Sequence, residues 1–340
     1  MDKKGDGEQF NWIFVIIAGS IILGFFVLFV FKFVELQEKR HDVKAVRFLG
    51  ESVIGASSKL QVGSGGAAID SNEDEGLRFG FYTNLEHFCR SNKSLLTINS
   101  NPDVFYKLDD EVVFMNKEMN SVNAIDIWIL PWNFPFHVTN LVYLADPKTN
   151  FYFVVDGNSR EFVENLDFSS AFDFEIINNN ELNKVKDNSK VVFFKSNEPS
   201  VNEVKSIKKN YKDIHFVYIN LNSLKAKFFD NQRESWSEGV KFYITEDNKG
   251  MLYGAIFSND ADNFECNVNR ALERVVFVSK VYSERARYLS HVDRRQGCDY
   301  GLLLNGLNKL NEWDGSSDLN SLVSSISKQN IEGAACLWVF

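Results

Sequence analysis

A single uncharged segment near the N-terminus limits what this chain can fold into. From Trp12 to Phe31 no residue is charged, and every residue except Ser20 is apolar or glycine. About 20 residues at about 1.5 Å each form a helix about 30 Å long, which matches the hydrocarbon core of a bilayer. We therefore expect a short tail at residues 1–10 and a transmembrane helix at residues 11–34, with the lipid bilayer as a partner.

A removable secretory signal is the alternative for this segment. Such a signal has an apolar region of about 7–15 residues and ends at a small-x-small cleavage site. The apolar run is longer here, and it passes directly into charged residues that begin with Lys32 and Glu35. The pattern favours a retained, single-pass anchor.

The charged sequence after the anchor also predicts a helix. Residues 35–61 contain no proline, and Val43, Val46, Leu49 and Val53 recur at three- and four-residue spacing. This gives an apolar stripe on a charged helix, which we interpret as an amphipathic stalk. The stripe would pack on a second copy, on a partner helix or on the chain's own domain, and the pattern leaves these alternatives open.

Glycine and acidic residues follow the stalk. Gly63, Gly65 and Gly66 precede Asp70 and Glu73, so residues 62–76 are predicted to form a flexible linker. A phosphate-binding loop is the alternative, but it needs a strand before the glycines and a helix with Lys-Ser/Thr after them. The sequence has neither, so the linker is favoured.

Residues 77–340 have the composition of a globular domain. The 31 phenylalanines of the chain provide ample apolar surface for a core. The formal net charge of −9 and the lack of a basic patch argue against nucleic acid as a partner. We expect an α/β fold with a mixed sheet, βαβ-like units and a C-terminal helical layer over residues 262–340.

The first part of this domain is predicted to be rich in strands. Segments 77–83, 94–98, 111–115, 124–130 and 140–146 are apolar or alternate between apolar and polar residues. Two prolines in the sequence PWNFPF then interrupt the pattern, and because proline donates no ladder hydrogen bond we expect an edge or a crossover there. The aromatic residues of PWNFPF would form a ligand shelf or, as favoured here, pack on the sheet.

Strands then alternate with short helices. Apolar runs at 151–155, 172–177, 190–194 and 214–221 are separated by helical stretches, which predicts a small parallel sheet covered on both faces. Asp156 and Ser159 follow the first of these strands, and ligands gather at such strand ends. They are therefore candidate ligand-binding residues. A turn followed by an N-cap serine explains the same letters and is the favoured alternative.

The end of the chain is predicted to be helical. Segments 241–245 and 251–257 are apolar and flank the loop residues Asn248, Lys249 and Gly250, which we interpret as a hairpin. Apolar residues at helical spacing then predict a long helix over residues 262–291 and shorter helices over residues 301–313 and 319–331.

Four cysteines lie outside the membrane segment, and their spacing does not suggest zinc. Cys266 and Cys298 flank a helix of about 28 residues and should lie about 40 Å apart, beyond the reach of a disulfide. The next helix runs back and the third returns, which brings Cys336 near Cys298. We predict Cys298–Cys336 and, by elimination, Cys89–Cys266. Disulfides favour a domain outside the cell; four buried thiols in a cytoplasmic domain are the alternative.

No catalytic pattern emerges. No GxSxG, HExxH or kinase-type motif is present, and the sequence predicts no metal site and no cofactor. His87 lies two residues before Cys89, but a Cys-His pair depends on spatial proximity that spacing alone does not give. The histidines are expected to be structural or exposed: His41, His87, His137, His215 and His291.

Two patterns disagree about the orientation in the membrane. Five basic residues follow the apolar segment within residues 32–47 and two precede it, so the positive-inside rule places the domain in the cytoplasm. However, Lys3-Lys4-Gly5 with Glu8 before the helix resembles the class III signal of archaeal type IV pilin-like proteins. This resemblance implies cleavage after Gly5 or Gly7 and a domain outside the cell. An apolar helix followed by an amphipathic one is also the pilin-like layout.

The strand-rich segment from residue 124 onward, followed by the helical end with its cysteines, is similar to membrane proteins of uncultivated archaea. This resemblance implies no particular activity. We therefore expect a single-pass, membrane-anchored protein of the cell envelope with a structural or interaction role. The alternative is a membrane-tethered enzyme or small-ligand sensor that uses the strand ends near Asp156.

Overall fold

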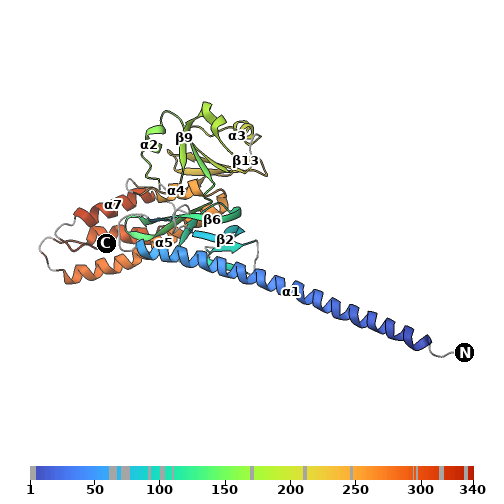
Figure 1. Ribbon diagram of the computed structural model, residues 1–340. Helices are drawn as coiled ribbons and strands as arrows, with labels where there is room; N and C mark the ends of the chain where they lie inside the picture. The colour runs from blue at the N-terminus through green and yellow to red at the C-terminus, as the bar shows by residue number, and fades with distance from the viewer. Residues whose placement is uncertain are drawn as a thin grey trace.

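The computed structural model describes residues 5–60, 67–69, 77–90, 93–99, 104–108, 111–168, 172–209, 213–245, 248–293, 295, 298–313, 318–332 and 336–340. These residues form a mixed α/β protein, as the sequence predicts. Five layers follow one another: the long helix α1 (Gly5–Leu60), a first sheet, the helices α4 (Gly250–Phe257) and α5 (Ala261–Val292), a second sheet, and an outer layer that contains α3 (Val201–Lys208) (Figure 1).

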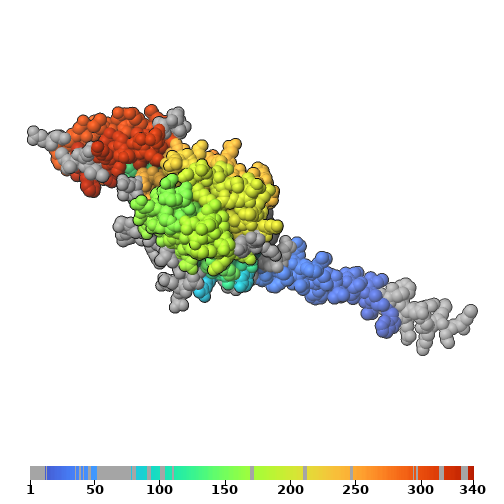
Figure 2. Space-filling model, turned by 90° about the horizontal axis from the view of Figure 1, so that it is seen from above, coloured from blue at the N-terminus to red at the C-terminus, as the bar shows by residue number. Residues whose placement is uncertain are grey.

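Helix α1 runs without interruption for 56 residues. Its segment Phe14–Val34 is long and apolar enough to cross a membrane, and none of that segment is buried. The helix therefore projects from the body, on the side opposite the C-terminal helices (Figures 1 and 2). Further along, Leu49 is fully buried against the first sheet, and Asp42 accepts a hydrogen bond from Asn99 Nδ2 at 2.9 Å. Part of the stalk thus packs on the chain's own domain.

Gly50 lets the stalk approach the sheet closely. A Cβ atom at this position would lie 2.3 Å from the ring of Tyr106, whereas at Gly24 of the same helix it would meet no atom within 4 Å. We expect Gly50→Leu to lower the free energy of unfolding by about 3 kcal/mol, because the ring and the helix must separate. Chemical denaturation of the detergent-solubilised protein measures this loss. Gly24→Leu is the matched control, and equal effects of the two variants would contradict the close packing.

The first sheet has the strand order β4-β3-β2-β6-β7-β5, and β1 also pairs with β6. All its pairs are antiparallel except β5 with β7. One face packs under α1 and the other under α4 and α5, which explains why both sides of the central strands are apolar. The strands are β1 (Ala67–Ile69), β2 (Leu77–Arg90), β3 (Lys93–Ile98), β4 (Phe105–Leu108), β5 (Val112–Phe114), β6 (Glu118–Asn133) and β7 (His137–Ala145).

The predicted linker is wrong in its middle. Residues 67–69 form β1, in which Ala68 lies opposite Trp128 of β6. Only Ile69 of these three residues favours a strand, and the glycines that precede them are typical of a flexible segment, so the local sequence does not predict β1. The rest of the predicted linker, residues 62–66 and 70–76, lies outside the described residues.

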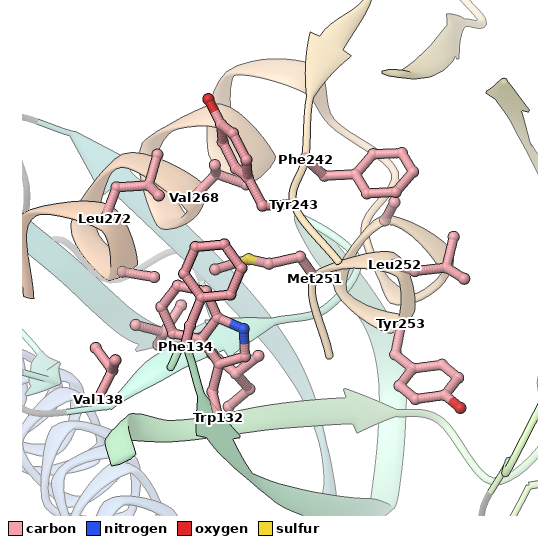
Figure 3. Close-up of a cluster of buried hydrophobic side chains, with 14 of the residues drawn as sticks. Trp132, Phe134, Val138, Phe242, Tyr243, Met251, Leu252, Tyr253, Val268 and Leu272 are labelled. Atoms are coloured by element: carbon pink, nitrogen blue, oxygen red, sulfur yellow. The ribbon is translucent and has the colours of Figure 1, made fainter. Parts of the chain in front are cut away.

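The sequence PWNFPF forms the tight connection between β6 and β7 rather than a crossover. Pro131 pairs with Asn140 of β7, and no strand of the described residues pairs on its other side, so it occupies an edge as expected. Trp132, Phe134 and Phe136 are buried. They share a core cluster with residues of α4 and α5, which favours packing over a ligand shelf (Figure 3).

The second sheet has the order β13-β12-β11-β10-β8-β9, and β14 pairs with β12. Strands β9, β8, β10 and β11 are parallel, as the βαβ-like pattern predicts. The inner face packs on α4 and the outer face on α3 and the 3-10 helix η1 (Asn179–Lys184). The strands are β8 (Asn150–Val155), β9 (Phe174–Asn178), β10 (Ser189–Phe194), β11 (Ile214–Asn220), β12 (Lys225–Asp230), β13 (Ser235–Trp236) and β14 (Val240–Lys241).

The predicted hairpin over residues 241–257 is wrong: in its first arm only Lys241 belongs to a strand, β14, and its second arm forms α4. Every residue of α4 is buried, because the helix lies between the two sheets. A short helix that is apolar all round has the same composition as a buried strand, so periodicity does not separate them. Gly254 permits the close contact, since a Cβ atom there would lie 2.8 Å from Phe114. The predicted helical layer is present as α5, α6 (Gly301–Asn311) and α7 (Leu319–Glu332).

Candidate functional site

The second sheet places one crevice where chain topology favours ligand binding. From β8 the chain passes through α2 (Arg160–Glu164) to β9 on one side, and from β10 it passes through α3 to β11 on the other side. The connections therefore leave the adjacent strands β8 and β10 in opposite directions, and such switch points open a crevice at the carboxyl ends of the strands. A cavity of about 290 Å³ lies there.

We call this crevice the strand-end cavity. Its walls come from the segments that follow three neighbouring parallel strands, β8, β10 and β11, so its shape depends on the sheet rather than on one loop. The lining residues are Asp156, Asn158, Ser159, Phe194, Lys195, Ser196, Ile219, Asn220, Leu221 and Asn222.

Asp156 connects two of these strand ends. Its Oδ1 accepts hydrogen bonds from the backbone of Asn158 and Ser159 and from the Ser159 hydroxyl, at 3.0 to 3.1 Å. Its Oδ2 accepts from the backbone N–H and the hydroxyl of Ser196, at 2.8 and 2.9 Å. The Ser159 hydroxyl also contacts the carbonyl of Phe194. The carboxylate thus fixes the walls of the cavity.

These bonds set the charge of Asp156. Burial raises the pKa of its carboxyl group, but the hydrogen bonds from Ser196 and Ser159 outweigh burial and lower the pKa to about 2. A carboxyl pKa that is lower in the folded state stabilises the fold above its ordinary pKa of 3.8, and this stability is lost as the pH falls from about 4 to about 2.

We expect Asp156→Asn to lower the free energy of unfolding at pH 7 by about 1–2 kcal/mol, after allowance for solvent screening. The deficit should shrink by about half at pH 3, because the wild-type carboxylate loses its advantage there. Urea unfolding at both pH values measures this. Asp173→Asn is the control, since Asp173 is exposed just before β9. A deficit independent of pH would contradict the charge-based account.

The remaining charges near the cavity are paired. Lys195 Nζ donates to Glu203 at 2.9 Å, and Lys227 lies 2.5 Å from Glu198 beside Tyr218. Asn220 donates from Nδ2 to the Tyr218 hydroxyl at 3.2 Å. The lining is therefore polar but close to neutral.

The structure brings both predicted ligand-binding residues, Asp156 and Ser159, into this cavity, in the hydrogen-bonded turn that was the favoured alternative. Among the residues that the structure describes, no second carboxylate lines it. Within the described residues, no group of three or more His, Cys, Asp or Glu side chains is arranged to hold a metal ion. Asn158, Ser196, Asn220 and Asn222 were not singled out by sequence reasoning, although each closely follows or ends an apolar run that predicted a strand.

Both predicted disulfides are confirmed. Cys89 of β2 pairs with Cys266 of α5, with Cα atoms 5.8 Å apart, and Cys298 pairs with Cys336, with Cα atoms 5.0 Å apart. Because the sulfur of Cys89 is bonded, it forms no nucleophilic pair with His87. The His87 imidazole is buried, and burial followed by the charge of Arg270 lowers its pKa to about 3.

One buried cation gave no sequence signal. Lys190 of β10 is 1% exposed, and its Nζ donates to Asn116 Oδ1 at 2.9 Å and to the carbonyl of Ser258 at 2.5 Å. Burial holds the pKa of this amine well below its ordinary value. Asn116 precedes β6 and Ser258 ends α4, so Lys190 links the second sheet to the layers beneath it. Exposed lysines also occur at the start of apolar strands, so the sequence does not predict that Lys190 is buried.

Comparisons with known proteins add no family to this description: no family profile matches the chain, and no curated protein or solved structure matches it.

Proposed function

We propose that this chain is a single-pass, membrane-anchored protein of the cell envelope with a structural or interaction role. One observation carries the proposal. Residues Phe14–Val34 form an apolar helical segment of which no part is buried among the described residues, while later turns of the same helix are packed on the first sheet. Water disfavours such a bare apolar surface, whereas a bilayer accommodates it.

The continuity of α1 supports an anchor over a removed signal. The helix passes from the apolar segment into the packed stalk without a break up to Leu60. A cut that removed the apolar segment would fall inside a continuous helix. The helix is apolar first and packed on the domain later, which also supports the pilin-like layout suggested by the N-terminal residues.

The outer face of the stalk supports a role in association. Leu36 and Val43, seven residues apart on one face of α1, are 58% and 50% exposed. Because residues seven apart share a helix face, a second copy or a partner helix would contact both. We expect chemical cross-linking in membranes to capture this contact. Leu36→Asp with Val43→Asp should abolish the product, whereas Lys44→Asp, which changes charge alone, should not do so to the same degree.

Membrane fractionation tests the anchor. The full chain should stay in membranes washed with alkaline carbonate, and a variant lacking residues 1–34 should become soluble with its fold intact. Replacing residues 14–34 by an unrelated apolar helix of equal length should restore the membrane location. A full chain that is extracted by carbonate would overturn the proposal.

The two disulfides support a domain outside the cytoplasm, because such bonds persist in oxidising compartments. We expect a membrane-impermeant thiol reagent to label intact cells only after reduction. Labelling that appears only after lysis and needs no reduction would place the domain in the cytoplasm, where the count of basic residues puts it.

A small-ligand sensor or tethered enzyme is the second candidate function. The strand-end cavity favours it, because a polar cavity at a switch point is a common ligand position in open parallel sheets. The single, fully hydrogen-bonded carboxylate of Asp156 supports binding more than catalysis.

A further inference from the structure

The charges around the strand-end cavity exclude strong attraction for an ion. Asp156 receives hydrogen bonds on both carboxylate oxygens, Lys195 is paired with Glu203, and Lys227 is paired with Glu198. An anion would meet the carboxylate, and a cation would have to displace the donors of Ser159 and Ser196. The lining therefore suits a neutral ligand.

Two side-chain amides at the rim of the cavity can still form hydrogen bonds with a ligand. Asn158 follows β8 and Asn222 follows β11, so their side chains flank the cavity from two segments. Both residues are exposed. Each donates a hydrogen bond from its backbone N–H, Asn158 to Asp156 and Asn222 to Asn220, and within the described residues neither side-chain amide has a hydrogen-bond partner. Each amide offers donors and an acceptor.

The Ser196 hydroxyl adds a further acceptor, because its proton is directed to Asp156. Leu221 and Ile219 contribute apolar surface to the lining. A neutral molecule with several hydroxyl groups and a small apolar face has the matching chemistry.

The volume limits the size of the ligand. A cavity of about 290 Å³ lies at the lower end of the range of about 300–1,000 Å³ that is usual for ligand sites, so it suits a small molecule. We propose that the strand-end cavity binds a small, neutral, polyhydroxylated ligand of the size of one sugar ring, held by Asn158, Asn222 and Ser196. This inference rests on the second candidate function and is independent of the membrane anchor.

Saturation-transfer NMR on the full chain in lipid nanodiscs tests this inference. The probes are D-glucose, N-acetyl-D-glucosamine and myo-inositol as free ligands, and dextran as a source of attached sugar units. We expect saturation transfer to at least one free probe or to dextran. Transfer to a free probe would identify a free ligand, whereas transfer to dextran alone would identify a sugar unit of a polymer. Empty nanodiscs give the background.

The decisive variant is Asn158→Ala combined with Asn222→Ala. Loss of both amides should raise the Kd of the responding probe at least about tenfold. The melting temperature should stay unchanged, because neither amide bonds to the described part of the fold. Asn305→Ala, which removes an exposed amide from α6, is the matched control and should bind like the wild type.

Three outcomes would overturn the inference. The first is no saturation transfer to any probe, and the second is an equal Kd for the double variant and the wild type. The third is a higher melting temperature of the protein with inorganic phosphate or Mg²⁺ but no response to the sugars. None of these outcomes changes the fractionation result. Conversely, a chain that is extracted from the membrane but still binds a probe would overturn the proposed membrane anchor and support the proposed ligand site.

Discussion

Phe257→Ala should lower the free energy of unfolding by about 4 kcal/mol, near the upper end for a single truncation in a core. Phe257 is 2% exposed at the end of α4. Its ring lies 4.9 to 6.2 Å, centroid to centroid, from five aromatic rings: Trp128, Tyr143, Phe151, Phe168 and Phe172. Trp128 and Tyr143 belong to the first sheet, Phe151 to the second, and Phe168 and Phe172 to the connection between α2 and β9. Because the surrounding rings include both sheets, the cavity left by the substitution cannot close without moving one sheet toward the other.

Denaturant unfolding followed by tryptophan fluorescence measures the loss. Phe277→Ala is the matched control, since that ring is 68% exposed on α5 and should contribute less than about 0.5 kcal/mol. Similar losses in the two variants would contradict the placement of α4 between the sheets.

Removal of the Cys89–Cys266 disulfide should cost about 5 kcal/mol, because it frees a loop that spans 177 residues of the unfolded chain. The Cys298–Cys336 disulfide closes a separation of 38 residues and should cost about 4 kcal/mol. The long bridge ties β2 of the first sheet to α5, so its loss should also loosen the helical layer over that sheet.

Paired serine substitutions, Cys89→Ser with Cys266→Ser and Cys298→Ser with Cys336→Ser, measure the two contributions under oxidising conditions. Reduction of the wild type should lower stability at least as far as the first pair of substitutions does. Stability that is insensitive to both reduction and the serine variants would contradict a contribution of the bridges in the unfolded state.

The local patterns of the sequence predicted much of the fold. Repeats of apolar residues over short windows predicted β2, β3, β5, β6 and β7 of the first sheet, the parallel arrangement in the second sheet and the long helix α5. They did not predict β1 or β4. The disulfide pairs followed from the length of one helix, because about 28 helical residues hold Cys266 and Cys298 far apart and leave few other partners.

The errors occurred where local composition fits two structures. Residues 251–257 are apolar whether they form a strand or a helix enclosed on all sides, and only the presence of a sheet above and below decides for the helix. Ala67–Ile69 is too short to show a period, and its pairing with β6 depends on a strand about 60 residues away. The stalk stripe likewise gave no information on which surface covers it.

The candidate site divides in the same way. Asp156 and Ser159 were visible in the sequence because a turn follows an apolar strand. Ser196 and Asn222 lie 40 and 66 residues after Asp156 in the chain. They join it only because the strand order places β8, β10 and β11 side by side. The hydrogen bonds from Ser196 then help to lower the pKa of the Asp156 carboxyl group, in addition to those from its sequence neighbour Ser159.

The sequence by itself determined the apolar helix and the strand and helix periods, because each depends on spacing along one continuous segment. It also determined the cysteine pairing, from the length of one helix and by elimination. The tertiary structure alone decided that α4 is a helix between two sheets, that Leu49 of the stalk packs on its own domain and that Lys190 is buried. The physical reason is that burial and hydrogen bonding depend on what surrounds a residue, and those surroundings come from distant segments that the fold brings together.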